Sequence, residues 1–217
     1  MKAGVFLVLL FGACFFSFAQ KKYKFGVKGG LSIVDFKQSG NSVGNQISDV
    51  NFRVSYHVGG FVQYSISDKI DMQSGVFFSS QGGSRSVEFI EDFNSSDIST
   101  DRTNFVYNYL NVPLLVKYNL SKSWSVKTGP QLGFLLSADV KNQYVFIDGI
   151  QFNFDSNVKD DASLIDVSWS LEAGYEFESG LLVDVTYNLG LSNTIDAENS
   201  DFKRENRVFQ LSLGYKF

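Results

Sequence analysis

The sequence has little cysteine, proline or histidine. Its 217 residues include one cysteine, Cys14, two prolines and one histidine, His57, and charged residues make up only 19% of the chain. A single cysteine excludes an internal disulfide framework, and a chain with 16% aromatic residues and so little proline is neither disordered nor collagen-like. The net charge of −4 argues against nucleic acid as a partner, because phosphate binding needs clustered Lys and Arg.

Long apolar runs are also absent, except at the beginning of the chain. That run, residues 5–18, is followed by Ala19, a small residue of the kind found at cleavage sites. The pattern predicts a secretory signal peptide over residues 1–19 and leaves residues 20–217 as one exported domain. Lipidation at Cys14 is an alternative, but the apolar run continues past this residue.

Apolar and polar residues alternate through the rest of the chain. In eight segments one phase is almost entirely apolar, and the other is polar or glycine. Such alternation requires β-strands with one oily and one polar face, and each segment is long enough to cross a membrane as a tilted strand of about 9 to 11 residues. The segments are 23–34, 52–66, 70–78, 109–120, 124–136, 165–177, 181–192 and 207–217.

Aromatic residues gather at one end of these segments, beside very short turns or a chain end. On the apolar phase they are Tyr23, Tyr64, Tyr118, Trp124, Tyr175, Phe177, Tyr215 and Phe217. The long connections at the other end are 37–51, 79–108, 137–164 and 193–206. This asymmetry predicts an all-β fold, an eight-stranded antiparallel up-and-down transmembrane β-barrel with short periplasmic turns, long extracellular loops and a place in the cell outer membrane. Glycines on the polar phase, such as Gly26, are expected to relieve crowding in so narrow a lumen.

Several blocks of sequence resemble one protein family. They are 59–69 (GGFVQYSISDK), 72–78 (MQSGVFF), 109–118 (YLNVPLLVKY), 129–133 (GPQLG), 187–191 (YNLGL) and 213–217 (LGYKF). Together they resemble the outer-membrane β-barrel proteins common in Bacteroidetes, known as PorT-like or "porin family" proteins. The resemblance covers essentially the whole mature chain. It implies the barrel fold and the outer membrane, and it implies no shared catalytic residue.

Motifs for catalysis or cofactor binding are absent from the sequence. Metal-ligand spacings, glycine-rich phosphate loops and Gly-x-Ser-x-Gly do not occur, so we expect no enzyme activity and no cofactor. The one candidate for lipid-modifying chemistry is His57 on the polar phase, which would need a nearby Asp or Ser. We expect His57 to be a hydrogen-bonded residue of the barrel interior instead.

Charged residues of both signs lie on the polar phase in the periplasmic halves of the predicted strands. Leaving them unpaired inside a narrow lumen would cost several kcal/mol, so we expect a network of ion pairs that includes Lys28 and Asp184. The short turn at 121–123 places Lys117 opposite Lys127, and Glu172 on the neighbouring strand is the expected carboxylate between them. The network is expected to plug the lumen; a gate that opens by exchanging pairs is the alternative.

The predicted extracellular loops are acidic. Asp and Glu outnumber Lys and Arg in the stretches 37–51, 82–104, 139–164 and 193–206. We expect solvated loops, with divalent-cation bridging to lipopolysaccharide or docking of a basic partner as alternatives. In the third loop, aromatic residues alternate around Asp148-Gly149, which predicts a hairpin above the membrane and a partner-contact surface. These aromatic residues are Tyr144, Phe146, Phe152 and Phe154.

The expected function is that of a non-enzymatic outer-membrane protein whose loops serve envelope integrity, adhesion or partner binding. The alternatives are a small-solute pore or secretion accessory and, less favoured, a lipid-modifying enzyme. The expected partners are outer-membrane lipid and lipopolysaccharide, the barrel-assembly machinery and an envelope protein. The last strand ends with Leu213, Tyr215 and Phe217 on the apolar phase, a pattern that the insertion machinery is expected to read.

Overall fold

A computed structural model describes the backbone of residues 22–39, 49–90, 98–147, 150–195 and 203–217. Side chains are described for 22–37, 52–84, 103–141, 155–195 and 203–217. The predicted signal peptide, Cys14 and the turn at 148–149 lie outside these residues. The strands are β1 (Tyr23–Ser39), β2 (Asp49–Asn51), β3 (Arg53–Ser65), β4 (Ile70–Ile90), β5 (Ile98–Asn119), β6 (Trp124–Ile147), β7 (Ile150–Asn157), β8 (Ile165–Glu176), β9 (Leu181–Gly190) and β10 (Lys203–Lys216), and η1 (Lys159–Asp161) is a short 3-10 helix.

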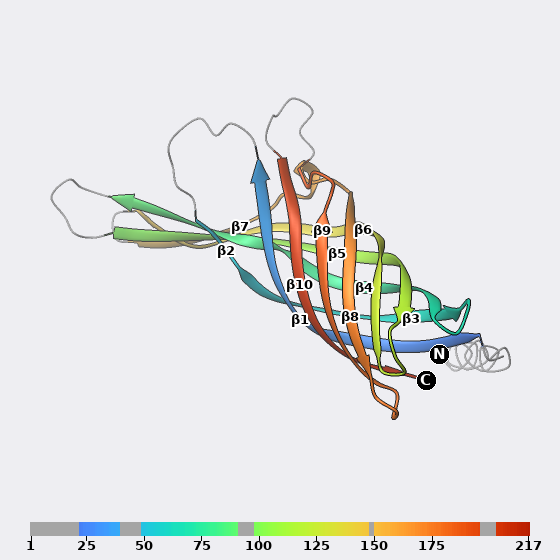
Figure 1. Ribbon diagram of the computed structural model, residues 1–217. Coiled ribbons are helices and arrows are strands. Elements are labelled where there is room, and N and C mark those ends of the chain that lie inside the picture. Colours follow the sequence, from blue (N-terminus) through green and yellow to red (C-terminus); the bar gives the residue numbers. More distant parts are fainter. Residues whose placement is uncertain (1–21, 40–48, 91–97, 148–149, 196–202) are drawn as a thin grey trace, which may run out of the picture.

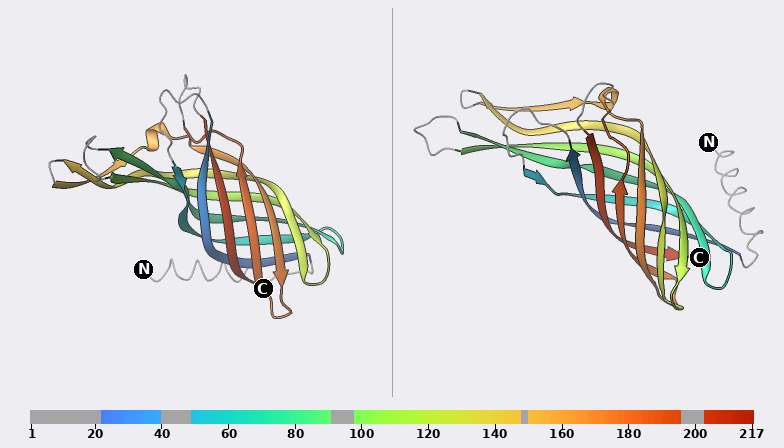
Figure 2. Two further views of the ribbon diagram at one scale, coloured as in Figure 1. Left: turned by 60° about the vertical axis from the view of Figure 1, so that its left-hand side comes forward. Right: turned by 45° about the horizontal axis from the view of Figure 1, so that its top comes forward.

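Eight of these strands close into an antiparallel barrel. The order around the barrel is β4-β3-β1-β10-β9-β8-β6-β5, and the pairing of β5 with β4 closes the ring. β1 lies between β3 and β10, so the first and last strands are hydrogen-bonded neighbours. Figures 1 and 2 show the strands tilted around a common axis, with the C-terminus at the end that carries the short turns. The predicted eight-stranded fold is confirmed.

Several strands continue beyond the predicted segments. The pairing of β4 with β5 runs from Ile70↔Tyr118 to Ile90↔Ile98, so most of the predicted 79–108 loop is strand. β6 likewise continues to Ile147 and pairs with β7, and both hairpins project beyond the barrel (Figures 1 and 2). The predicted loop was wrong because apolar alternation marks only the lipid-facing part of a strand, whereas backbone hydrogen bonds extend the sheet past the membrane.

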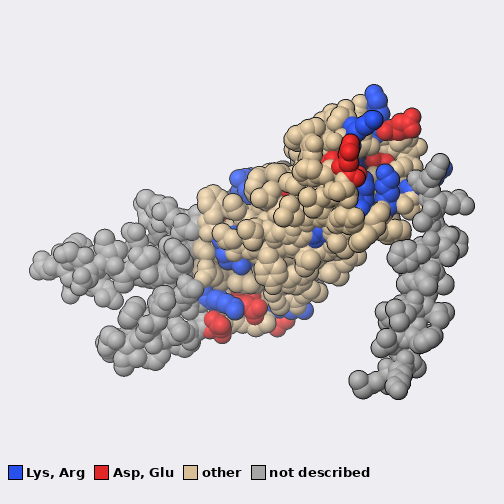
Figure 3. Space-filling model, turned by 90° about the horizontal axis from the view of Figure 1, so that it is seen from below, with Lys and Arg blue, Asp and Glu red and all other residues tan. Residues whose placement is uncertain are grey.

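The barrel is apolar outside and polar inside. In β8, Trp169 and Leu171 are 47% and 54% exposed, whereas Ser170 and Glu172 beside them are 1% and 2% exposed. A soluble barrel would bury its apolar face, so this inversion identifies a surface that lies against lipid. On the face seen in Figure 3, charged residues gather mainly at the two ends. In the described part of the chain no helix is long and apolar enough to cross a membrane.

The aromatic residues at the end with short turns form a band in which neighbouring rings are in contact in small groups. The ring centroids of Tyr23 and Tyr64 are 5.0 Å apart, and those of Trp124 and Tyr175 are also 5.0 Å apart. Further contacts join Tyr175 to Phe177 and Tyr215 to Phe217. Rings with a polar edge are favoured at a membrane interface, so this band marks the periplasmic boundary of the lipid-facing surface.

Glycines make room for large side chains inside the barrel. A Cβ atom at Gly26 would overlap the ring of Phe61, and one at Gly75 would lie 2.8 Å from the ring of Phe77. Both phenylalanines are buried and pack with Leu182. The expected role of lumenal glycine in relieving crowding is therefore seen at these two positions.

Candidate functional site

The lumen contains a cluster of four buried, alternating charges, which we call the ion-pair cluster. It consists of Lys28 on β1, Lys127 on β6, Glu172 on β8 and Asp184 on β9. Lys28 Nζ lies 2.6 Å from Glu172 Oε2 and 3.3 Å from Asp184 Oδ2. Lys127 Nζ lies 3.1 Å from Asp184 Oδ1 and also contacts Glu172 Oε1. Two ammonium groups thus alternate with two carboxylates, and the cluster is electrically neutral.

Hydrogen bonds and a glycine complete the surroundings of this cluster. Thr186 Oγ1 donates to Glu172 Oε2 at 2.9 Å. A Cβ atom at Gly174, which lies opposite Asp184 in the sheet, would overlap the Asp184 carboxylate. The four charges come from four different strands, and a buried ion pair repays its desolvation only when its geometry is good and its other hydrogen bonds are satisfied. The cluster therefore joins opposite walls of the barrel.

Lys117 does not join this cluster, although we expected Glu172 to bridge it to Lys127. The predicted register is present, since Lys117 lies opposite Lys127. However, Lys117 Nζ lies 3.5 Å from Glu176 Oε2 and donates to Gln63 Oε1 at 3.3 Å. Like charges directly opposite each other repel, and both Glu172 oxygens are already occupied by Lys127 and Lys28. Lys117 therefore extends toward the periplasmic end.

His57 lies deep in the lumen between two hydroxyl groups. Its Nδ1 is 3.0 Å from Ser32 Oγ and its Nε2 is 2.7 Å from Ser212 Oγ, and the residue is 4% exposed. A cavity of about 30 Å³ beside it is also lined by Lys28 and Glu172. That volume holds one or two waters and no lipid. The geometry matches the expected hydrogen-bonded interior residue.

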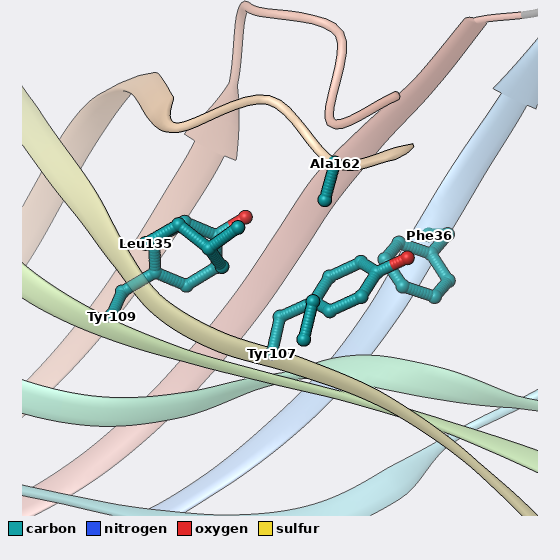
Figure 4. Packing of buried hydrophobic residues seen from close by; sticks show 6 residues of the cluster. Phe36, Tyr107, Tyr109, Leu135 and Ala162 are labelled. Carbon is teal, nitrogen blue, oxygen red and sulfur yellow. The ribbon is translucent and has the colours of Figure 1, made fainter. Parts of the chain in front are cut away.

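An apolar layer fills the lumen at its extracellular end, and we call it the apolar cap. It is made of Phe36, Tyr107, Tyr109, Leu135, Ala138 and Ala162, all of which are buried. Figure 4 shows the side chains of Phe36, Tyr107 and Tyr109 inside the barrel wall with Ala162 above them. The Arg204 guanidinium carbon lies 4.9 Å from the centroid of the Phe36 ring. The cap thus places a dehydrated layer between the polar lumen and the cell exterior.

The segment that follows β7 lies across this end of the barrel. Its backbone is held by bonds from Val158 N to Ala138 O at 2.9 Å and from Ser163 N to Thr194 O at 3.0 Å. Ala162 between them forms a bridge with Ile195 and supplies the methyl group in the cap. The segment is therefore held at the extracellular end of the barrel by hydrogen bonds to β6 and to the chain that follows β9.

The apolar cap was not predicted from the sequence. Its signal is the run of aromatic residues at alternate positions, Phe105, Tyr107 and Tyr109, on the inward phase of β5. Residues 105 and 107 fall in the connection 79–108 that the sequence predicts as a loop. On the inward phase of one strand, a change from polar to aromatic residues would have predicted an apolar plug.

The backbone of the predicted aromatic hairpin is present as the antiparallel pair of β6 and β7. β6 and β7 pair at Lys141↔Asp155 and at Phe146↔Gln151. The side chains of Tyr144, Phe146, Phe152 and Phe154 lie outside the described ones, and their role in partner contact stays a prediction. β2, β4, β5, β6 and β7 pair side by side in this outer region, which we call the outer sheet.

Residues proposed for insertion lie at the seam of the barrel. Leu213 and Tyr215 pair with Gly29 and Val27 of β1, and both point outward. Phe217 N donates to Phe25 O at 2.8 Å. The last strand thus joins the first strand on the lipid-facing surface, and recognition by the insertion machinery stays a prediction. In the described ranges no group of three or more His, Cys, Asp or Glu residues is arranged to hold a metal ion.

A closed barrel with an apolar exterior and a filled polar lumen defines an integral outer-membrane β-barrel protein. The model of the family described as outer membrane protein beta-barrel domain matches residues 18–196 of this chain. The chain belongs to this family, and its place is the outer membrane.

Among solved structures, several bacterial barrels are similar. Ail, the attachment invasion locus protein of Yersinia pestis, is 15% identical, with 90% of this chain and 99% of that chain covered and a TM-score of 0.41. Neisserial surface protein A is 12% identical, with 88% and 95% covered and a TM-score of 0.46. OprG from Pseudomonas aeruginosa is 13% identical, with 91% and 97% covered and a TM-score of 0.42. No curated protein matches the chain.

Proposed function

We propose that this protein is a non-enzymatic, non-conducting outer-membrane barrel whose outer sheet binds a protein of the envelope or of the cell's surroundings, in adhesion or in envelope integrity. The outer sheet is the observation that carries the proposal. The paired part of β4 from Ser79 to Ile90 alone spans roughly 40 Å at the rise of a strand. Closing a barrel requires only short connections, so a paired stretch of this length beyond the predicted membrane-spanning segment is explained by an interaction outside the membrane.

The filled lumen supports the same proposal against the transport alternative. A solute crossing the barrel would have to displace the apolar cap and separate the ion-pair cluster. Both layers join opposite walls, and breaking a buried ion pair costs several kcal/mol. Similarly, His57 contacts Ser32 and Ser212 beside a cavity of about 30 Å³, which leaves no room for a lipid at the imidazole.

We further propose that the chain belongs to the PorT-like branch of Bacteroidetes barrels, on the sequence blocks at 59–69 and 109–118. Lipopolysaccharide and outer-membrane lipid are its proposed neighbours, and the barrel-assembly machinery is its proposed insertion partner. The hairpin of β6 and β7 supplies the proposed protein contact through Tyr144, Phe146, Phe152 and Phe154.

Shortening this hairpin tests the proposal. Lys141 and Asp155 lie opposite each other, so Asn-Gly can replace residues 142–154 as a two-residue turn. The full-length protein is expected to capture a partner from native envelope by cross-linking, and the shortened variant is expected to lose it. Heat-modifiable gel migration would show that both barrels are closed. Equal capture by both proteins would contradict the role of the hairpin.

Two further measurements separate the alternatives. The parent protein is expected to be silent in planar bilayers, and steady conductance would support the pore instead. His57→Ala is expected to leave the composition of outer-membrane lipids unchanged in mass spectrometry. A lipid species that disappears with this substitution would support the lipid-modifying enzyme.

A further inference from the structure

The periplasmic end of the barrel contains an open cavity, which we call the vestibule. Its volume is about 500 Å³, within the range of about 300 to 1,000 Å³ typical of small-molecule sites. Five lysines and three carboxylates line it, a surplus of two positive charges in a protein whose net charge is −4. The charged lining residues are Lys24, Lys69, Lys117, Lys122, Lys216, Asp68, Asp71 and Glu176.

The carboxylates of the vestibule only partly compensate its lysines. Glu176 is shared, because one oxygen contacts Lys216 Nζ and the other lies 3.5 Å from Lys117 Nζ. Asp71 Oδ2 accepts hydrogen bonds from the Gln63 and Asn119 side-chain amides, at 2.9 and 2.8 Å. Neither carboxylate therefore gives Lys117 a short ion pair.

Lys117 is the informative residue because it is buried. Its side chain is 6% exposed, and its two polar contacts, to Gln63 at 3.3 Å and to Glu176 at 3.5 Å, are long for an ammonium group. A buried charge is costly unless it is closely paired and hydrogen-bonded. Lys117 is also one of the residues that line the vestibule. It is thus a desolvated cation that a bound anion would complete.

The other lysines lie around the rim. Lys69 and Lys122 are on the exposed turns after β3 and β5, and neither forms an ion pair with a described carboxylate within 4.0 Å. Lysines on flexible stems that converge from separate elements suit a multiply charged oxyanion, and Lys is a common phosphate-binding residue. A doubly charged group would match the surplus of two positive charges.

We propose that the vestibule binds a phosphate group that approaches from the periplasm. Lys117 contacts the phosphate oxygens at the base of the cavity, and Lys69 and Lys122 hold it from the rim. The phosphate belongs either to a soluble periplasmic molecule or to the headgroup of an anionic phospholipid in the inner leaflet. This proposal does not depend on the extracellular role of the outer sheet.

The test uses the full-length barrel in zwitterionic detergent. Inorganic phosphate is titrated by isothermal calorimetry, and retention of phosphatidylglycerol against phosphatidylcholine is measured by native mass spectrometry. Saturable binding of phosphate without selective retention of phosphatidylglycerol supports a soluble ligand. Selective retention of phosphatidylglycerol, with or without phosphate binding, supports a headgroup.

Three variants locate the site. Lys117→Gln is expected to weaken binding by about tenfold or more, as expected for losing a hydrogen bond between charged groups. The rim double variant Lys69→Gln/Lys122→Gln changes only exposed positions, so it keeps the test valid if the first variant fails to fold. Lys37→Gln is the matched control, because Lys37 is exposed near the opposite end of β1. Absence of binding of both probes, or binding that neither Lys117→Gln nor the rim variant weakens, would overturn the proposal.

Discussion

Replacing Glu172 by Gln tests the structural role of the ion-pair cluster. The substitution preserves side-chain shape but removes one of two carboxylates, which leaves Lys28 and Lys127 to share Asp184. The Nζ atoms of Lys28 and Lys127 lie 3.3 and 3.1 Å from the Asp184 carboxylate, so one carboxylate would then face two ammonium groups. Because Glu172 is 2% exposed, bulk solvent cannot stabilise the two ammonium groups in its place. Removing one partner of a buried pair costs about 3 to 5 kcal/mol, and we expect a loss of unfolding free energy in this range.

A matched control lies near the opposite end of the barrel. Glu205 is 3.8 Å from Lys37 in a pair with exposed fractions of 26% and 49%. Exposed pairs contribute about 0 to 1 kcal/mol, so Glu205→Gln should change stability by no more than that. Both substitutions remove one negative charge from the protein, and the difference between them reports burial.

Unfolding by guanidinium in detergent micelles gives the measurement. Trp124 and Trp169 lie on the lipid-facing surface, so their fluorescence reports transfer into water. The double variant Glu172→Gln/Lys127→Gln restores neutrality, because Lys28 and Asp184 remain, and we expect it to be more stable than the sum of the two single changes predicts. Equal midpoints for Glu172→Gln and Glu205→Gln, or strict additivity in the double variant, would refute the reasoning.

Three other outcomes are expected. Gly26→Ala should destabilise the barrel by about 1 to 3 kcal/mol because its methyl group overlaps Phe61, whereas Gly60→Ala, whose Cβ atom would meet nothing closer than 3.7 Å, should be neutral in the same unfolding assay. Removal of Tyr215–Phe217 should lower the outer-membrane level without blocking export, since Phe217 N bonds to Phe25 O at the barrel seam; unchanged levels in fractionated envelopes would argue against this. Protein sequencing should find Gln20 as the first residue of the mature chain, and retention of residues 1–19 would rule out the signal peptide.

The number of strands and the register at the short turns could be predicted from the sequence. A lipid-facing strand must be apolar at every second residue, and this requirement marks each crossing of the membrane. The turn at 121–123 is so short that it fixes the pairing of its flanking strands, and Lys117 does lie opposite Lys127. Features that depend on neighbouring residues, such as the strand positions and the pairing across a short turn, could therefore be predicted from the sequence.

The ion-pair partner of Lys117 could not be predicted in the same way. Glu172 meets Lys127 across the β6–β8 pairing, but the chain between these strands includes β7 and η1. Several carboxylates on the polar phase were therefore equally available to Lys117 in the sequence. Lys117 pairs with Glu176 because Lys28 and Lys127 already occupy both oxygens of Glu172. Lys28 lies on β1, far from Glu172 in the sequence. This competition among lysines for Glu172 arises only once the barrel has closed and has brought distant strands together.

The layered filling of the lumen also separates the two proposals. The apolar cap and the ion-pair cluster lie between the vestibule and the outer sheet, so a phosphate bound at Lys117 has no open route to the exterior. Substitutions at distant sites without shared partners have nearly additive effects. The rim variant Lys69→Gln/Lys122→Gln should therefore capture the same extracellular partner as the parent, and the shortened hairpin should bind phosphate as the parent does. Loss of both activities in either variant would mean that the lumen transmits a conformational change, and the view of the lumen as a rigid plug would then be wrong.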